Sequence, residues 1–360
     1  MYRSRWPKKK KGKYGFCFRN YHTRKRMKYR EYRIDNIRAL AILLVVFGHS
    51  IIIYDPSWGV YTPKYESAIL EIIKHYISLV QMPLFFSLSG YCFAISKEKN
   101  QGIRFLGKKA KRLLLPFFMV GILWMIPIRF ISQYPFWIDK SAIKVFIQFI
   151  LGVDSGHLWY LPTLFFIFVI FGATRSFYLG TKKYMYMTLI GATLLILSVL
   201  SPLFPKYFFI RFIAQYLWWF YIGYVIKDFA SIVELLRAKN NVSILLLLIS
   251  ICVLSMIVFD IFTIKIIDIV LNYFGTSVFV LSCYLLISDQ KNTTWSYLSQ
   301  NSFGLYLFHS PIIYLVFRYL SQMKPIIVVI VDFFVCGGIA LLITMVLRKT
   351  RIGRLVIGEN

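Results

Sequence analysis

Long runs of apolar residues, separated by short polar stretches, cover most of the chain beyond residue 36. Each run holds about 17–25 residues, the length that an α-helix needs to cross the hydrocarbon core of a membrane. The runs are continuous and lack the alternation of a β-barrel strand, so helices are the expected element. The pattern predicts about ten transmembrane helices, at residues 37–54, 76–95, 113–132, 157–176, 184–203, 208–226, 242–262, 266–287, 303–320 and 325–347.

The same pattern divides the chain into three parts. Residues 1–33 form a basic tail, 34–347 a membrane domain and 348–360 a short basic tail. The predicted fold class is therefore an all-α integral membrane protein. The apolar piece at 143–151 is too short to span, so we expect it to lie at the interface or to re-enter the membrane. No cleavable signal peptide is expected, because the first apolar run follows more than thirty mostly polar residues.

Charge sets the expected orientation. The chain is 58% hydrophobic and carries a net charge of +28. Cytosolic segments of membrane proteins are rich in Lys and Arg. With the N-terminus in the cytosol, the segments on that side hold 32 of the 43 basic residues, so both termini are predicted to be cytosolic. The first tail is expected to lie against anionic lipid, in preference to nucleic acid.

The first apolar run, RIDNIRALAILLVVFGHS, carries Arg38 and His49. Eleven residues at about 100° each return to within about 20° of the same face, roughly 16 Å along the helix. Ionisable groups inside a membrane usually mark a site or pathway. A neutral imidazole suits a general base, although His49 could also be a buried residue bonded to a neighbouring helix. Arg38 needs an anion, either Asp35 or a phosphate of a ligand.

The segment 96–112 is dense in positive charge just before the third predicted span. Its cluster could satisfy the orientation rule alone, or it could hold a nucleotide-like polyphosphate. The members of this cluster are Lys108, Lys109, Lys111 and Arg112.

Two later stretches add polar groups to apolar surroundings. His157 and Trp159 lie at the outer start of the fourth predicted span, where they could belong to an interfacial aromatic belt or line a sugar site. His309 lies about two turns inside the ninth span, just before Pro311, and a second intramembrane histidine indicates a polar core. The five cysteines are scattered and show no metal spacing, so no metal is expected.

Taken in order, these patterns resemble the acyltransferase-3 family of membrane O-acyltransferases. The resemblance rests on Arg38 and His49 in the first span, and on "SGY" at 89–91 followed by Ser96. Three further stretches are similar to that family's signatures: "KKAKRLLLPFF", "HLWYLP" and "SFGLYLFHSPI". The similarity runs from about residue 33 to residue 347.

The resemblance implies roles for particular residues. His49 would be the catalytic histidine, and Arg38, Lys109 and Arg112 would bind an acyl-CoA donor, with acetyl-CoA as the default. Lys109 departs from the family pattern, which has an arginine there. A lysine cannot form the bidentate hydrogen bonds that an arginine forms with phosphate. His157, Trp159 and His309 would form an acceptor site or a second polar site.

The resemblance also implies partners and a location. The acceptor would be a surface polysaccharide, a glycolipid or peptidoglycan, and the protein would be a multi-pass protein of a bacterial plasma membrane. His49 could act as a base, or it could be acylated and pass the group on. A transporter or flippase for a lipid-linked sugar, using the polar passage without covalent chemistry, is the alternative function.

Overall fold

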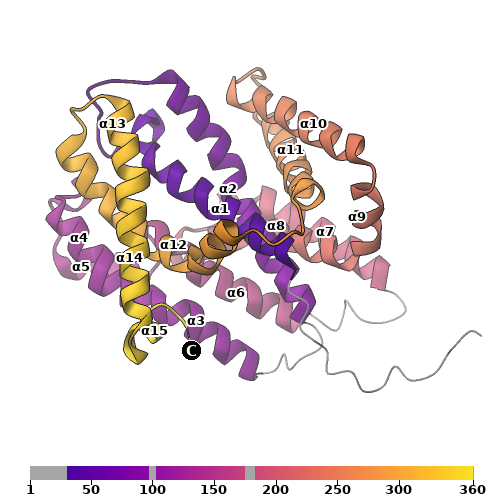
Figure 1. Cartoon of the computed structure of the whole chain (residues 1–360), viewed down its shortest axis with the longest axis horizontal. Coiled ribbons are helices and arrows are strands. Elements are labelled where there is room, and N and C mark those ends of the chain that lie inside the picture. Colours follow the sequence, from indigo (N-terminus) through magenta and orange to yellow (C-terminus); the bar gives the residue numbers. More distant parts are fainter. Residues whose placement is uncertain (1–30, 97–102, 175–182, 360) are drawn as a thin grey trace, which may run out of the picture. The chain divides into compact units, whose positions relative to one another are not determined.

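Every regular element that the structure describes is a helix. The computed structural model describes residues 31–96, 103–174 and 183–359, so the basic tail expected to meet anionic lipid lies almost wholly outside the described residues. Figure 1 shows the helices in chain order. They are α1 (Tyr32–Ser50), α2 (Ala68–Ile95), α3 (Ile103–Val120), α4 (Ile126–Ile131), α5 (Ala142–Ile150), α6 (Tyr160–Ala173), α7 (Lys183–Val199), α8 (Ile210–Asp228), α9 (Ala230–Arg237), α10 (Asn240–Val258), α11 (Lys265–Leu286), α12 (Thr293–Leu320), α13 (Pro325–Ile330), α14 (Gly337–Arg348) and α15 (Arg351–Val356).

Eight helices in the described part of the chain are long and apolar enough to cross a membrane, which confirms an all-α membrane protein. They are Ala68–Ile95, Arg104–Ile131, Gly156–Ala173, Tyr207–Asp228, Asn240–Val258, Lys265–Leu286, Thr293–Leu320 and Pro325–Arg348. The two other predicted spans coincide with α1, which has charged side chains in its first two turns, and with α7, which has 17 residues.

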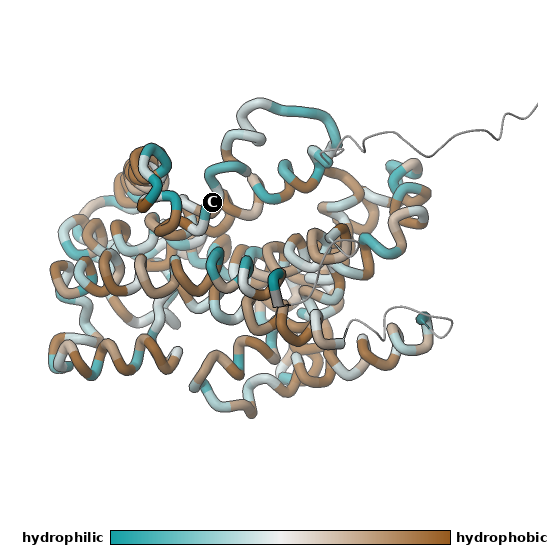
Figure 2. Tube along the Cα trace, turned by 90° about the horizontal axis from the view of Figure 1, so that it is seen from below, coloured by the Kyte–Doolittle hydropathy of each residue, from teal (hydrophilic) through white to brown (hydrophobic). Residues whose placement is uncertain are grey.

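Large apolar side chains lie on the outside of the bundle. Figure 2 shows hydrophobic positions along most helices and hydrophilic ones gathered mainly near their ends. The helix α5 coincides with the apolar piece that was expected at an interface, and its Ile143 is 73% exposed while Val145 and Phe149 are buried. Exposed isoleucine is costly in water but not in lipid, so this surface is suited to a membrane.

The helices α2 and α8 pack at very short range. A Cβ added to Gly90 would lie 1.9 Å from the carbonyl oxygen of Phe220, and one added to Gly223 would lie 1.7 Å from that of Ser87. Each glycine therefore lets its helix approach the backbone of the other, as small residues do in membrane bundles. The helix α2 also packs against α1.

Gly90→Leu is expected to separate α2 from α8 and to lower the thermal unfolding midpoint of the detergent-solubilised protein. Overpacking a tight core typically costs about 1–3 kcal/mol, and here the obstacle is backbone that cannot rotate away. The matched control is Gly172→Ala on α6, because a Cβ there meets nothing within 4 Å. Equal midpoints for the two variants would contradict the close packing.

Candidate functional site

A cavity of about 390 Å³ lies among α1, α2, α3, α6 and α12. Three of its lining side chains are the cations Arg38, Lys109 and Arg112, which the sequence analysis selects from two separate helices. The remaining lining residues are Met82, Phe85, Leu88, Ser89, Cys92, Leu113, Tyr160, Leu164, Phe168, Ser299, Gln300, Ser302, Phe303, Tyr306, Ile357, Gly358 and Glu359. Part of the cavity lining is therefore cationic, and much of the remainder is apolar or hydroxyl-bearing.

Arg38 has a protein partner and also faces the cavity. Its Nη1 donates to Asp35 Oδ1 at 3.2 Å and to Ser299 Oγ at 3.3 Å. Ser299 in turn donates to the same Asp35 oxygen at 3.0 Å. The ion pair with Asp35, one of the two partners considered from sequence, is thus present. It orients the guanidinium without removing it from the cavity, since about a third of the side chain stays exposed.

Lys109 lies against aromatic rings. Its Nζ is 3.9 Å from the ring centroid of Phe168 and 5.2 Å from that of Phe105, both within cation–π range. The two rings hold the ammonium group beside the cavity. A lysine presents a single charge here, in place of the planar fork of an arginine.

Three histidines from three parts of the chain form a cluster. The ring centroids of His49 and His309 are 5.0 Å apart, and those of His309 and His157 are 5.6 Å apart. His49 lies one residue before the end of α1, His309 lies within α12, and His157 lies just before α6. The sequence analysis infers a polar core from His49 and His309, and the structure places His157 beside them as well.

Backbone contacts fix which nitrogen of each ring carries the proton. Nδ1 of His49 lies 2.8 Å from the carbonyl oxygen of Val45, and a carbonyl can only accept, so Nδ1 donates and Nε2 keeps its lone pair. The same holds for His309, whose Nδ1 lies 2.7 Å from the oxygen of Leu305. In His157 the roles are reversed, because Nε2 lies 3.1 Å from the oxygen of Leu307.

Two of these lone pairs are buried without a donor. Among the described residues, Nε2 of His309 and Nδ1 of His157 have no hydrogen-bond partner. Buried polar atoms are seldom left unpaired, because each costs about 1–3 kcal/mol. A cluster of acceptor nitrogens that lack hydrogen-bond donors is suited to a ligand that brings hydroxyl groups.

One of two tyrosines that line the cavity also contacts the histidine cluster. Tyr306 lines the cavity, its hydroxyl donates to the backbone oxygen of His157, and its ring lies 5.6 Å from that imidazole. Tyr160 also lines the cavity, and its hydroxyl lies 3.2 Å from Ser89 Oγ. The three histidines do not line the cavity itself. Tyr306 thus connects the lining of the cavity to the histidine cluster.

Trp159 packs against aromatic side chains of α8, whereas His157 and His309 belong to the histidine cluster. Its ring stacks on Phe212 at 4.4 Å and on Tyr216 at 5.0 Å. These contacts belong to the aromatic packing between α6 and α8. A role for Trp159 at the acceptor therefore gains no support from the geometry.

Arg129 is a feature that the sequence analysis missed. It is 1% exposed, donates to Asp154 Oδ1 at 3.0 Å and to the Tyr314 hydroxyl at 3.1 Å. Asp154 also accepts from the Trp137 indole at 2.6 Å. Burial raises the pKa of the neighbouring Tyr134, which keeps that phenol neutral. The sequence feature that points to Arg129 is a single arginine within an apolar run. An ionisable residue in such a run seldom occurs without a role.

The Arg129 network joins the elements that carry two of the histidines. Asp154 precedes His157 by three residues, and Tyr314 follows His309 by five.

Asp154→Asn is expected to lower the thermal unfolding midpoint, because removing one partner of a buried ion pair typically costs about 3–5 kcal/mol. The control is Asp139→Asn, an exposed carboxylate nearby in sequence. An unchanged midpoint for Asp154→Asn would show that Arg129 does not depend on this carboxylate.

The described residues hold no group of three His, Cys, Asp or Glu side chains arranged to bind a metal ion.

Comparison with known proteins gives a match to a family model: the model, described as an acyltransferase domain, covers residues 31–349. Neither the curated proteins nor the solved structures contain a match.

Proposed function

The chain belongs to the acyltransferase-3 family, and we propose that it moves an acyl group from a cytosolic acyl-CoA to a hydroxyl of a surface carbohydrate. Family membership and the membrane helices make it a membrane acyltransferase. The donor, the acceptor and the placement in a bacterial plasma membrane are the proposed parts. Acetyl-CoA is the default donor, and polysaccharide is preferred to a glycolipid or peptidoglycan.

The cationic cavity supports a coenzyme A donor. The phosphates of coenzyme A require several positive groups at one place. Arg38, Lys109 and Arg112 all line this cavity. Arginine binds phosphate through two parallel N–H donors, and lysine adds a point charge. The apolar part of the lining suits the pantetheine arm. The acyl end would pass Tyr306 to reach the histidines.

The histidine cluster supports a hydroxyl acceptor. Nε2 of His49 would take the hydroxyl proton as the oxygen attacks the thioester carbonyl carbon. The C–O bond forms, the C–S bond breaks, and the proton passes from the imidazole to the departing thiolate. The acceptor nitrogens of His309 and His157, unpaired within the described part of the chain, would receive other hydroxyls of the same sugar.

One observation carries the proposal: α1 bears Arg38 in the cationic cavity and His49 in the imidazole cluster. A single helix thus connects a phosphate-binding region to a base, as transfer between two substrates requires. The ten residues between them place the two side chains about 16 Å apart along the axis.

The purified protein, reconstituted in liposomes, tests the function. We expect it to release coenzyme A from acetyl-CoA labelled in its acetyl group only when a carbohydrate acceptor is present, and to leave the label on that acceptor in an ester. Cells with and without the gene should differ in the O-acyl content of their surface glycans. Movement of a lipid-linked sugar with no donor consumed would instead identify a flippase.

A further inference from the structure

Residues 350–359 lie beyond the part of the chain that the family model matches, yet the cavity lining includes Ile357, Gly358 and Glu359. Thr350 caps the short helix α15 by accepting from the backbone N–H of Gly353 at 2.9 Å. Ile357 is 1% exposed and lies in the main hydrophobic core. The segment expected to be a basic tail is therefore packed into the membrane domain.

Gly358 fixes how closely the segment approaches α3. Its φ is +66°, a conformation that glycine adopts without strain. A Cβ at this position would lie 2.5 Å from the carbonyl oxygen of Arg112. Glu359 follows directly, so the cavity that holds three cations also receives a carboxylate from the chain itself.

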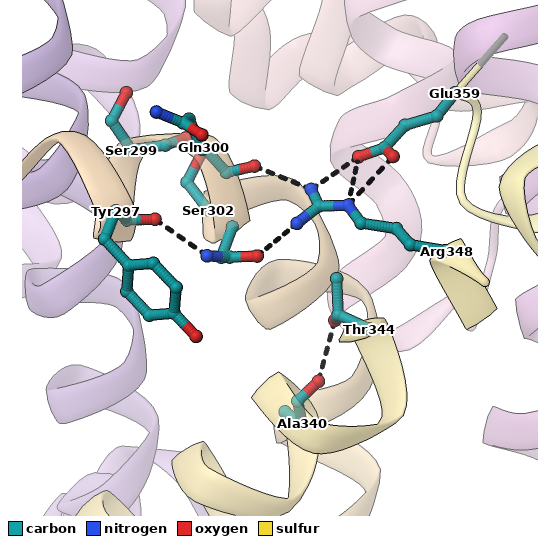
Figure 3. Close-up of polar contacts among 9 residues, drawn as sticks. Tyr297, Ser299, Gln300, Ser302, Ala340, Thr344, Arg348 and Glu359 are labelled. Atoms are coloured by element: carbon teal, nitrogen blue, oxygen red, sulfur yellow. Dashed lines mark hydrogen bonds and ion pairs between the residues drawn. The ribbon is translucent and has the colours of Figure 1, made fainter. Parts of the chain in front are cut away.

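That carboxylate binds Arg348. Nε of Arg348 lies 2.9 Å from each oxygen of Glu359, and Nη2 lies 2.5 Å from one of them. Nη2 also donates to the backbone oxygen of Gln300 at 2.8 Å, and Nη1 donates to the side-chain oxygen of Asn301. Figure 3 shows the Arg348 guanidinium between Glu359 and α12, and Gln300 and Glu359 both line the cavity.

We propose that Arg348, which is not itself part of the cavity lining but is bound to the lining residue Glu359, becomes a fourth phosphate-binding cation when a donor phosphate displaces the Glu359 carboxylate. The inference rests on the proposed donor. A carboxylate and a phosphate bind a guanidinium in the same two-point manner, so one can replace the other. Both partners are accessible for exchange, since the Arg348 side chain is 27% exposed and that of Glu359 is 35% exposed. Glu359 thereby sets the affinity of the cavity for its anionic ligand.

The test is the equilibrium dissociation constant of coenzyme A, measured by titration calorimetry on the full-length protein in detergent. Glu359→Gln keeps the shape of the side chain and removes the competing charge, so coenzyme A should bind roughly tenfold more tightly. Arg348→Gln removes the cation and leaves the carboxylate, so binding should weaken by at least as much. The double variant should bind within about twofold of the wild type, because both the gain and the cost are gone.

Glu234→Gln is the matched control, because Glu234 also pairs with arginines, Arg33 and Arg237, but on α9 and outside the cavity lining. It should leave the dissociation constant unchanged. General loss of folding cannot imitate the expected result, since it would weaken binding in both single variants. Weaker or unchanged binding in Glu359→Gln, with normal wild-type binding, would overturn the inference alone. No binding by the wild type would overturn the proposed donor and this inference with it.

Discussion

His49→Ala is expected to lower acyl transfer by about 10²–10⁴-fold, the usual loss when a general base is removed. Membrane insertion and coenzyme A binding should remain near the wild-type level. The imidazole bonds to Val45 of its own helix and lies beside His309, so its removal takes away no contact with the cationic cavity. The measurement is the initial rate of transfer at saturating donor, with the dissociation constant of coenzyme A measured in parallel.

His75→Ala is the matched control for this variant. His75 lies on α2, and its side chain is 41% exposed, so its loss should leave the rate unchanged. Near-normal transfer by well-inserted His49→Ala protein would remove His49 from the reaction. The base would then have to be sought at His309 or His157.

Arg38→Ala is expected to raise the donor KM by about 10–100-fold, because a charge-assisted hydrogen bond to an ionised group contributes about 1.5–3 kcal/mol. The rate at saturating donor should change less, since Arg38 is one of three cations in the cavity. Arg38→Lys should restore only part of the affinity, because a point charge cannot replace the planar fork. Donor-dependence curves at fixed acceptor separate the two constants.

A purely structural role for Arg38 predicts a different result. Arg38→Ala and Asp35→Ala would then both lower the yield of folded protein, and exchanging the two residues would recover it. In that case the donor KM of the folded fraction would match the wild type. The contact of Arg38 with both Asp35 and the cavity makes this comparison necessary.

The sequence predicts the membrane fold and much of the candidate site, because both depend on patterns that are local or regularly spaced. Apolar runs of spanning length identify helices whatever their neighbours. The eleven-residue spacing places Arg38 and His49 on one face of α1. The order of the motifs selects Lys109 and Arg112, which the structure then brings to the same cavity as Arg38.

The remainder of the site depends on contacts between distant segments. From the sequence, Glu359 is only part of a basic tail. Its place at the cavity follows from the packing of the Gly358 backbone against Arg112. From the sequence, Arg129 is an isolated charge. Only the structure shows that Asp154 and Tyr314 bind it. The stacking of Trp159 on Phe212 and Tyr216 likewise depends on α8, which the local pattern around Trp159 does not reveal.

The structure of a complex with a non-hydrolysable acetyl-CoA analogue tests most directly whether the cationic cavity and the histidine cluster form one active site. The phosphates should lie at Arg38, Lys109 and Arg112, with the acyl end beyond Tyr306. The carbonyl carbon should come within about 5 Å of His49 Nε2, leaving room for one hydroxyl oxygen between them. An analogue bound outside the cavity, or one whose acyl end stays on the cationic side of Tyr306, would contradict the account.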